Sequence, residues 1–449
     1  MTHELTAATQ VAMPKHTDII DAFTGPLLVC TGTYFRGGVS SWAIRFARLA
    51  RRAGLDVRLT MPWPETRDWM DRSSYTLLDH AADLGEAGAV ARLPLSRWSQ
   101  LSTRNDRQNA LADALAPLAE GATLLLNNDW DLFGATARLV RRGLAIRVVN
   151  IVHSDDEVYY AIARHYAPMF LGVVAVSTVV SEELRSRRLV GPDSEIPDAP
   201  VCAIPCGVEM PEAAERTPRD GPIRMVTACR LDERQKRASD IPRVGAVLRE
   251  RGIDFAWTVL GDGPERARLE CSLREAGLSD RIRLLGWCAH DRVLDAFRSA
   301  DIYVQTSAFE GTPVSVMEAM AYGVVPVVTE VSGTSELLGA GSAKVGLSAP
   351  VGDVAALAGA VSSLASDPAR LAELSIGAEV RARSVLSIEQ TTRALLDFLA
   401  TLPNGTSRWP STRSTAVQLA DVGEREARLD WLPNPVAVAA RWSLRTLRR

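Results

Sequence analysis

The chain has 449 residues, of which 47% are hydrophobic and 23% charged, and a formal net charge of −3. This length predicts two or three folded units. The balanced charge argues against nucleic-acid binding, which needs a basic surface. Six scattered cysteines predict reduced thiols rather than a disulfide framework or a zinc site. We find no signal peptide and no run of ~18 apolar residues, so we expect a cytoplasmic protein.

The first half of the chain alternates short apolar runs with helical segments, a pattern typical of α/β units with parallel sheets. A strand expected at 26–31 is followed by a loop that ends in Gly37 and Gly38, and by a helix that begins near Val39. Without a Cβ, these glycines let backbone N–H groups approach a phosphate or a sugar. An ordinary tight turn before a helix is the alternative. Further strands are expected at 56–62, 123–126, 146–152 and 172–177.

Two of these strands end in polar residues. Asn127, Asn128 and Asp129 follow the strand at 123–126, and we consider them as contacts for an acceptor substrate. His153 closes the strand at 146–152 and precedes an acidic helix start. Such a histidine is either a packed residue of the core or a functional group at the edge of a sheet. The acidic residues after it, at 155 and 156, suit helix caps.

The composition changes near residue 204, where proline, glycine and charge predict a linker at 206–222. The alternation then restarts, with strands expected at 223–228, 255–261, 282–287 and 301–307 and helices near 240–251, 264–277 and 291–299. We therefore predict an N-terminal domain at 25–205 and a C-terminal domain at 223–384, after an extension at 1–24. The Arg-rich tail at 402–449 is expected to be partly disordered. Its basic end suits an anionic membrane surface, a partner protein or a disordered terminus.

The segment FEGTPVSVMEAM places Glu310 in a loop after a strand and Glu318 inside an apolar helix. We expect Thr312 to cap this helix and Pro313 to be its first residue. A buried carboxylate is costly unless hydrogen bonds satisfy it, so Glu318 either caps a neighbouring loop or binds ligand hydroxyls. The backbone N–H groups of Gly311, Thr312 and Val314 would form an anion site. N–H groups that can bind phosphate, beside two carboxylates that can bind hydroxyls, are typical of a nucleotide-sugar site.

At this point the chain resembles the retaining glycosyltransferases of family 4, which have the GT-B fold. Glu310 and Glu318 match the E-x7-E motif of that family. The segments FRGGVSSW, GVVAVS, IPCGVE, GDGPERARLE, IRLLGW and SGTSELL agree with it in the same order. The resemblance covers about residues 25–400. It implies two Rossmann-like domains that face each other across a cleft, with a helix at 385–401 crossing back to complete the first.

The resemblance also implies roles for individual residues. Arg230 and Lys236 would hold the donor diphosphate, and two fixed cations stabilise a leaving group that gains negative charge. Glu310 would bind the sugar hydroxyls, Glu318 the ribose, and His153 the reacting sugar. Two departures affect the Arg–Lys loop: Cys229 replaces a usual glycine, and the spacing from Arg230 to Lys236 is one residue longer than usual.

Trp287, at the end of IRLLGW, would either stack on the nucleobase or belong to the core. The implied donor is a UDP- or GDP-sugar and no metal is expected. Acceptors would be sugars, lipid-linked molecules or small molecules in the biosynthesis of a polysaccharide, glycolipid or other glycoconjugate. Two alternatives stay open: a GT-B epimerase or hydrolase of nucleotide sugars, and a non-catalytic GT-B module that binds them.

Overall fold

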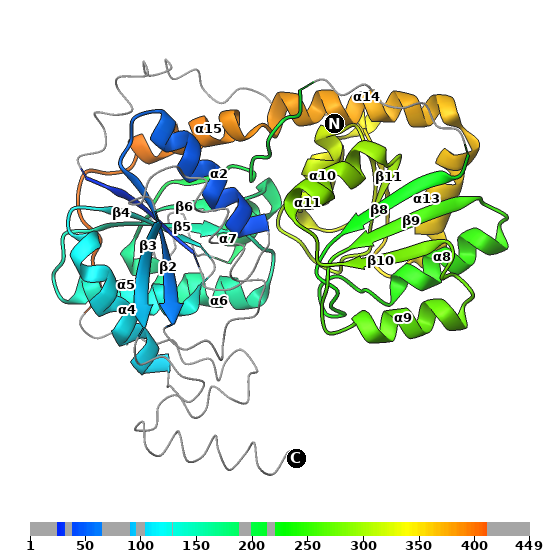
Figure 1. The fold of residues 1–449 in the computed structure, drawn as a ribbon. Helices are drawn as coiled ribbons and strands as arrows, with labels where there is room; N and C mark the ends of the chain where they lie inside the picture. Colours follow the sequence, from blue (N-terminus) through cyan, green and yellow to red (C-terminus); the bar gives the residue numbers. More distant parts are fainter. Residues whose placement is uncertain are drawn as a thin grey trace, which may run out of the picture.

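A computed structural model describes residues 25–31, 38–64, 90–95, 104–127, 129–187, 199–212 and 221–410. Within them the chain forms one seven-stranded and one six-stranded sheet, which lie side by side in Figure 1. All pairings between the named strands are parallel. The predicted extension at 1–24, Gly37, Asn128 and the tail beyond residue 410 lie outside the described residues.

The first sheet has the strand order β3-β2-β1-β4-β5-β6-β7. Its strands are β1 (Leu27–Cys30), β2 (Val57–Pro64), β3 (Val90–Leu95), β4 (Thr123–Asn127), β5 (Arg147–Val152), β6 (Phe170–Ala175) and β7 (Val201–Ala203). The helical elements between them are α2 (Gly38–Arg52), α4 (Arg104–Ala119), α5 (Trp130–Arg141), α6 (Glu157–Tyr166), η2 (Ala167–Met169) and α7 (Thr178–Ser186).

The second sheet has the strand order β10-β9-β8-β11-β12-β13. Its strands are β8 (Ile223–Ala228), β9 (Phe255–Leu260), β10 (Ile282–Gly286), β11 (Ile302–Gln305), β12 (Val325–Thr329) and β13 (Leu347–Ala349). Its helical elements are α8 (Asp240–Glu250), α9 (Arg266–Glu275), α10 (His290–Ser299), α11 (Val314–Ala321), α12 (Ser332–Leu338), η3 (Gly341–Ala343) and α13 (Val354–Ser366).

Both sheets are doubly wound, so the central strands are covered on both faces and are mostly apolar. Strand β4 has the sequence TLLLN and β12 the sequence VPVVT, and all of their residues are buried. In each sheet the strand order reverses at one point, between β1 and β4 and between β8 and β11. Crevices at such reversal points are where open α/β sheets bind ligands. The fold class predicted from the sequence, two Rossmann-like domains, is confirmed.

Two long C-terminal helices connect the sheets. Helix α14 (Pro368–Val385) packs against α11 of the second domain, and α15 (Ile388–Ala400) packs against α2 of the first (Figure 1). The first residues of the predicted linker are not an exposed connector, because Cys206 and Val208 are buried. Val208 pairs through its backbone with Leu386 and Ile388 at the junction of the two helices. The two chain crossings between the domains therefore support each other.

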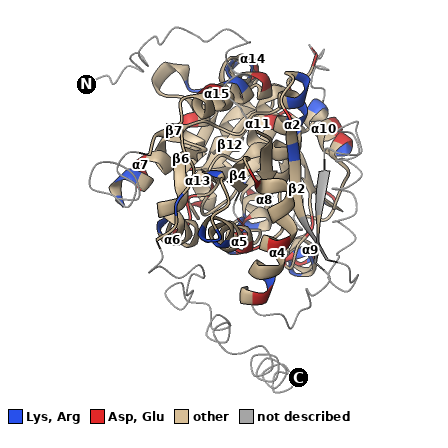
Figure 2. Cartoon of the chain, turned by 90° about the vertical axis from the view of Figure 1, so that its left-hand side faces the viewer, with Lys and Arg blue, Asp and Glu red and all other residues tan. Residues whose placement is uncertain are grey.

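Charged residues of both signs are spread over the helices, as Figure 2 shows for α4 and α5. Arg107 pairs with Asp131 at 2.6 Å and Arg142 pairs with Asp113 at 2.7 Å, so part of this charge is neutralised between the two helices. Among the described helices, none is both long and apolar enough to cross a membrane. All six cysteines are free thiols, and two of them are fully buried.

Candidate active site

The carboxyl edges of the two sheets meet at two glycines. A Cβ on Gly38, at the start of α2, would lie 2.6 Å from a methyl group of Val314. A Cβ on Gly311 would lie 2.1 Å from the carbonyl oxygen of His153. Real Cβ atoms do not approach that closely, so only glycine lets these segments touch. The start of α2 therefore lies directly against the start of α11, and the residue after β5 lies against the loop that joins β11 to α11.

Glu310 forms the first polar cluster of this edge. Its side chain is buried, and its Oε1 lies 2.5 Å from Nζ of Lys236 and accepts a hydrogen bond from Ser307 at 2.7 Å. The amide of Gln235 lies 3.4 Å from Oε2. Burial alone would lower the pKa of Lys236, but the Glu310 carboxylate outweighs it and raises that pKa. Lys236 is therefore a permanent cation in this pocket.

Arg230 belongs to the same loop but points outward. Its side chain is half exposed, and its Nε donates to Asp232 at 2.9 Å. Asp232 in turn accepts from the backbone N–H of Gln235, which joins this ion pair to the Glu310 cluster. The guanidinium is therefore open to solvent while its partner keeps it near the loop.

The loop from Arg230 to Lys236 is followed by an unusual backbone conformation at Arg237. Among the described residues, Arg237 is the one non-glycine residue with positive φ, at 48°. Such a conformation costs about 1 kcal/mol for a residue with a Cβ. The side chain compensates by pairing with Asp240 at 2.7 Å. This turn directly follows Lys236, whose ammonium group lies against Glu310.

The turn GDG, at residues 261–263, packs against the loop that runs from Arg230 to Lys236. A Cβ on Gly261 would lie 1.8 Å from the carbonyl oxygen of Cys229, and one on Gly263 would lie 2.2 Å from that of Leu231. Backbone hydrogen bonds from Leu231 to Asp262 and from Glu265 to Leu231 hold the two loops together. These glycines shape the loop that carries Arg230.

The N-terminus of α11 differs from the sequence-based expectation. Thr312 does not cap the helix: its hydroxyl donates to the carbonyl oxygen of Val176 in the first domain, at 2.5 Å. Pro313 is the N-cap residue, and no side chain caps the helix. Within the described part of the chain, the N–H groups of Gly311, Thr312 and Val314 have no hydrogen-bond partner. Binding of an anion by these groups stays a prediction.

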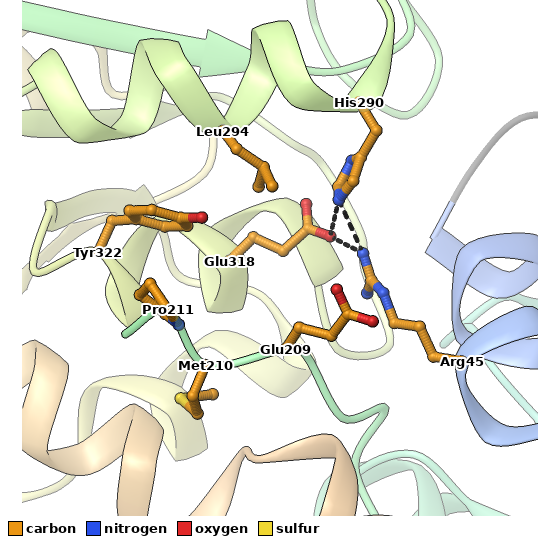
Figure 3. A pocket seen from close by; sticks show the side chains of 8 residues that line it. All are labelled: Arg45, Glu209, Met210, Pro211, His290, Leu294, Glu318 and Tyr322. Atoms are coloured by element: carbon orange, nitrogen blue, oxygen red, sulfur yellow. Dashed lines mark hydrogen bonds and ion pairs between the residues drawn. The ribbon is translucent and has the colours of Figure 1, made fainter. Parts of the chain in front are cut away.

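Glu318 forms a second polar cluster on the same helix. Its Oε1 accepts a hydrogen bond from Nη2 of Arg45, which comes from α2 in the first domain. Nε2 of His290 lies 3.2 Å from the same Arg45 nitrogen and 3.8 Å from the carboxylate (Figure 3). Burial lowers the pKa of His290, which favours a neutral ring that accepts from Arg45.

The sequence interpretation missed Arg45. Helix α2 carries the apolar residues Trp42, Phe46 and Leu49 along one face, and Arg45 lies one turn from both Trp42 and Leu49. An arginine beside an apolar stripe is a usable signal, because a buried guanidinium requires a carboxylate or a ligand.

His153 is a packed residue in this structure. Its ring is buried, Nε2 lies 2.6 Å from Oδ1 of Asn127, and Nδ1 lies 3.4 Å from the thiol of Cys206. The edge of Trp42 packs on the ring, with centroids 5.2 Å apart. Burial lowers the pKa of His153 to about 3, so the ring is neutral. The contact between His153 and a sugar stays a prediction, and it would require one of these hydrogen bonds to be exchanged.

The residues considered for the acceptor separate into two environments. Asn127 is buried and donates to the carbonyl oxygens of Cys30 and Leu125, so it serves the fold. Asp129 is the N-cap of α5 and accepts from Leu132 at 3.0 Å. Burial and the neighbouring Asp131 raise the pKa of Asp129 to about 6. Asp129 therefore exchanges its proton closer to neutral pH than a free aspartate does, whereas the amide of Asn127 does not titrate.

Trp287 is not a core residue, because 44% of its surface is exposed. It follows Gly286, whose φ of 73° turns the chain at the end of β10. Stacking on a nucleobase stays a prediction for this side chain. In the part of the chain that the structure describes, no group of three or more His, Cys, Asp and Glu residues is placed to hold a metal ion.

Further contacts join the domains beside the site. The carboxylate of Glu336 in α12 accepts from the backbone N–H groups of Thr178 and Val179 at the start of α7, both at 3.0 Å. Ser332 donates to Asp155, and Arg234 pairs with Asp156 at 3.0 Å. The two domains are therefore docked against each other around Glu310 and Glu318.

Comparison with curated proteins gives partial matches. The chain is 37% identical over 135 residues to a 2-deoxystreptamine glucosyltransferase of Streptomyces kanamyceticus, which covers 30% of this chain and 34% of that protein. It is 36% identical over 137 residues to the lipopolysaccharide core biosynthesis mannosyltransferase LpsB of Rhizobium meliloti, covering 30% and 38%. A putative colanic acid biosynthesis glycosyltransferase, WcaL of Salmonella typhimurium, is 29% identical over 259 residues, covering 54% and 59%. Each match spans less than two thirds of the relative.

Solved structures show the same fold over most of the chain. Alr3699/HepE of Anabaena in complex with UDP-glucose has a TM-score of 0.67 and 16% identity, covering 84% of this chain and all of that one. TarM of S. aureus, solved as a mutant with UDP and two carbohydrates, has a TM-score of 0.65 and 11% identity over 84% of this chain. The model of the family described as "Glycosyl transferases group 1" matches residues 212–381. The chain therefore has the GT-B fold, and its residues 212–381 are similar to the group 1 glycosyl transferases.

Proposed function

We propose that this protein is a retaining glycosyltransferase that moves a sugar from a nucleotide-diphosphate-sugar donor to a hydroxyl acceptor. The observation that supports this most directly is the pairing of Lys236 with Glu310, 2.5 Å apart, beside the uncapped N-terminus of α11. A cation and free N–H groups suit a diphosphate, and the carboxylate suits sugar hydroxyls. Both lie where the carboxyl edges of the two sheets meet.

The donor is expected to be a UDP- or GDP-sugar. Lys236, Arg230 and the N-terminus of α11 would bind its diphosphate, Glu310 the hydroxyls of its sugar, and Glu318 its ribose. Two of the solved structures of similar fold were obtained with UDP and UDP-glucose. This likeness supports a nucleotide donor for the present chain. The exposed Trp287 is the group we assign to the nucleobase.

The chemistry we propose is a front-face displacement. The bond from the anomeric carbon to the donor phosphate breaks while the acceptor oxygen bonds to the same face of the sugar. The acceptor proton passes to the departing phosphate, whose charge Lys236 and Arg230 stabilise. Glu310 is a poor covalent nucleophile because its carboxylate is held by Lys236 and Ser307. Its role is to position the sugar, and no step is assigned to a metal ion.

The acceptor is expected to be a precursor of a polysaccharide, a glycolipid or another glycoconjugate, held by the first domain. The names of the relatives include lipopolysaccharide, colanic acid and 2-deoxystreptamine enzymes, which supports this class without selecting one member. Asp129 lies at the end of β4 and is the side chain we assign to an acceptor hydroxyl. A cytoplasmic location and contact of the tail with a membrane or protein stay predictions.

The test is turnover of a panel of UDP- and GDP-sugars, with and without candidate acceptors. Release of nucleotide diphosphate that depends on an acceptor is the expected result. Release or epimerisation without an acceptor would identify an epimerase or hydrolase instead. Binding without turnover across the panel would identify a non-catalytic module. The anomeric configuration of the product, determined by NMR, tests retention separately.

A further inference from the structure

Arg45 carries a buried donor that nothing in the described protein satisfies. Only 5% of its surface is exposed. Its Nη2 is used by Glu318 and His290, whereas Nη1 is buried without a hydrogen-bond partner in the described part of the chain. A buried charged N–H without an acceptor is costly, and such groups usually mark the position of a ligand or an ordered water. The guanidinium is held in place by two residues of the second domain, so its free edge has a fixed direction.

Arg45 lines a cavity between the domains. The cavity has a volume of about 150 Å³ and includes Glu209, Met210 and Pro211 of the linker together with Leu294, Tyr322 and Glu318 of the second domain. Figure 3 shows the guanidinium turned toward the space between the two carboxylates, with Leu294 and Tyr322 on the far side. Among the described residues, none donates a hydrogen bond to Oε2 of Glu318. Two residues that line the cavity therefore carry one unpaired donor and one unpaired carboxylate oxygen, with apolar groups opposite.

A sugar diol matches this arrangement. Each hydroxyl can donate one hydrogen bond and accept others, whereas a guanidinium only donates and a carboxylate only accepts. Two neighbouring hydroxyls can satisfy both groups at once, one by accepting from Nη1 and the other by donating to Oε2. A phosphate would meet repulsion from Glu318 and Glu209, and a purely apolar ligand would leave the Arg45 donor buried and unsatisfied. The ribose of a nucleotide has the required vicinal diol.

We propose that Arg45 recognises the ribose of the donor nucleotide, with Nη1 donating to one ribose hydroxyl while Glu318 accepts from the other. This inference rests on the proposed function, which assigns Glu318 to the ribose, and adds a partner from the first domain. The ribose site is then complete only when the domains are docked, because Arg45 belongs to α2 and Glu318 to α11. Recognition of a ribonucleotide and domain closure become one event.

The experiment compares nucleotide diphosphates that differ in a single hydroxyl. Binding of UDP, GDP and their 2′-deoxy and 3′-deoxy forms is measured by titration calorimetry on the full chain, for the wild type and for Arg45→Met, Arg45→Lys, Glu318→Gln and Arg52→Met. The loss of a hydrogen bond to a charged group corresponds to about 10- to 100-fold in affinity. We expect the wild type to discriminate against at least one deoxy form by about that factor. Arg52 is exposed at the end of the same helix, so Arg52→Met is the matched control and should keep the wild-type pattern.

The expected result for Arg45→Met is weaker binding of the ribonucleotide with little change for that deoxy form, so that the discrimination disappears. Arg45→Lys keeps the charge beside Glu318 but lacks the second N–H edge, and it should lose most of the discrimination while thermal unfolding confirms that it is folded. Equal weakening of both forms by Arg45→Met and Arg45→Lys would overturn the inference, because it would mean that Arg45 only holds Glu318. Loss of discrimination in Glu318→Gln but not in the Arg45 variants would overturn it as well. A wild type that binds no nucleotide diphosphate would instead refute the proposed function.

Discussion

The α-carbon of Gly311 lies against the carbonyl oxygen of His153, so close that a Cβ would come within 2.1 Å of it. Gly311 belongs to the loop between β11 and α11, and His153 follows β5 of the other sheet. The same glycine also contacts Gly333, where an added Cβ would lie 1.8 Å from the Gly311 carbonyl oxygen. The docked arrangement of the two domains thus depends on a direct backbone contact between Gly311 and His153.

Gly311→Ala should hold the two domains apart. A backbone carbonyl cannot yield as a flexible side chain can, and overpacking of a tight contact costs about 1–3 kcal/mol. We expect a larger radius of gyration by small-angle X-ray scattering and a loss of transferase activity, with unchanged circular dichroism. Gly359→Ala is the control, because its added methyl group would meet only the end of Arg251 at 3.3 Å. Equal radii and activities for the two variants would show that the solution structure does not depend on this contact.

Lys236→Ala should damage the donor site far more than Arg234→Ala. Lys236 is the buried partner of Glu310, whereas the Arg234 side chain is 72% exposed and pairs with Asp156. Exposed ion pairs contribute about 0–1 kcal/mol, while loss of a cation that faces the leaving phosphate should lower kcat/KM by about 100-fold or more. Initial rates with the preferred donor measure both variants. If Arg234→Ala were the more damaging change, the diphosphate would have to lie on the outer side of this loop.

Much of the scaffold follows from local sequence patterns. The run IRMVTA predicted a strand at 223–228, and β8 occupies those residues. Gly54 and Gly323 follow the ends of α2 and α11, and both have positive φ, at 91° and 68°. Apolar strands covered on both faces and glycines after helices are governed by near neighbours in the chain. Such features need no knowledge of the rest of the molecule.

The features that the sequence did not predict depend on distant partners. Thr312 has the local pattern of an N-cap, but its hydroxyl binds Val176, 136 positions away. Cys206 and Val208 have the composition of a linker, yet they are buried because residues 386–388 pair with them. Arg45 finds Glu318 across the domain boundary. Periodicity within one helix or strand carries no information about which side chain faces it from another domain.

His153 should make the protein less stable as the pH falls below neutrality. Its folded-state pKa is lowered from 6.5 to about 3 by burial. Between these values the unfolded chain binds a proton that the folded chain does not, so stability is present above pH 6.5 and is lost as the pH falls. Near pH 5 the loss is about 2 kcal/mol. Urea unfolding of the wild type and of His153→Gln at pH 7 and pH 5 gives the free energy of unfolding of each. The difference between the two proteins at each pH isolates His153, because the contributions of the other titratable groups cancel. A pH-independent difference would mean that the folded protein protonates His153 as readily as the unfolded chain does.

Glu336 should protect two backbone amides of the other domain. The first N–H groups of a helix have no partner within it; in α7, Ser177 caps Val180, while the Glu336 carboxylate binds Thr178 and Val179. Glu336→Ala removes this cap, so we expect hydrogen exchange at Thr178 and Val179 to accelerate several-fold while Val180 changes little. Glu330→Ala is the control, since the Glu330 carboxylate accepts a hydrogen bond from the hydroxyl of Ser348 within its own domain. Unchanged exchange at both amides in Glu336→Ala would show that α12 and α7 are apart in solution.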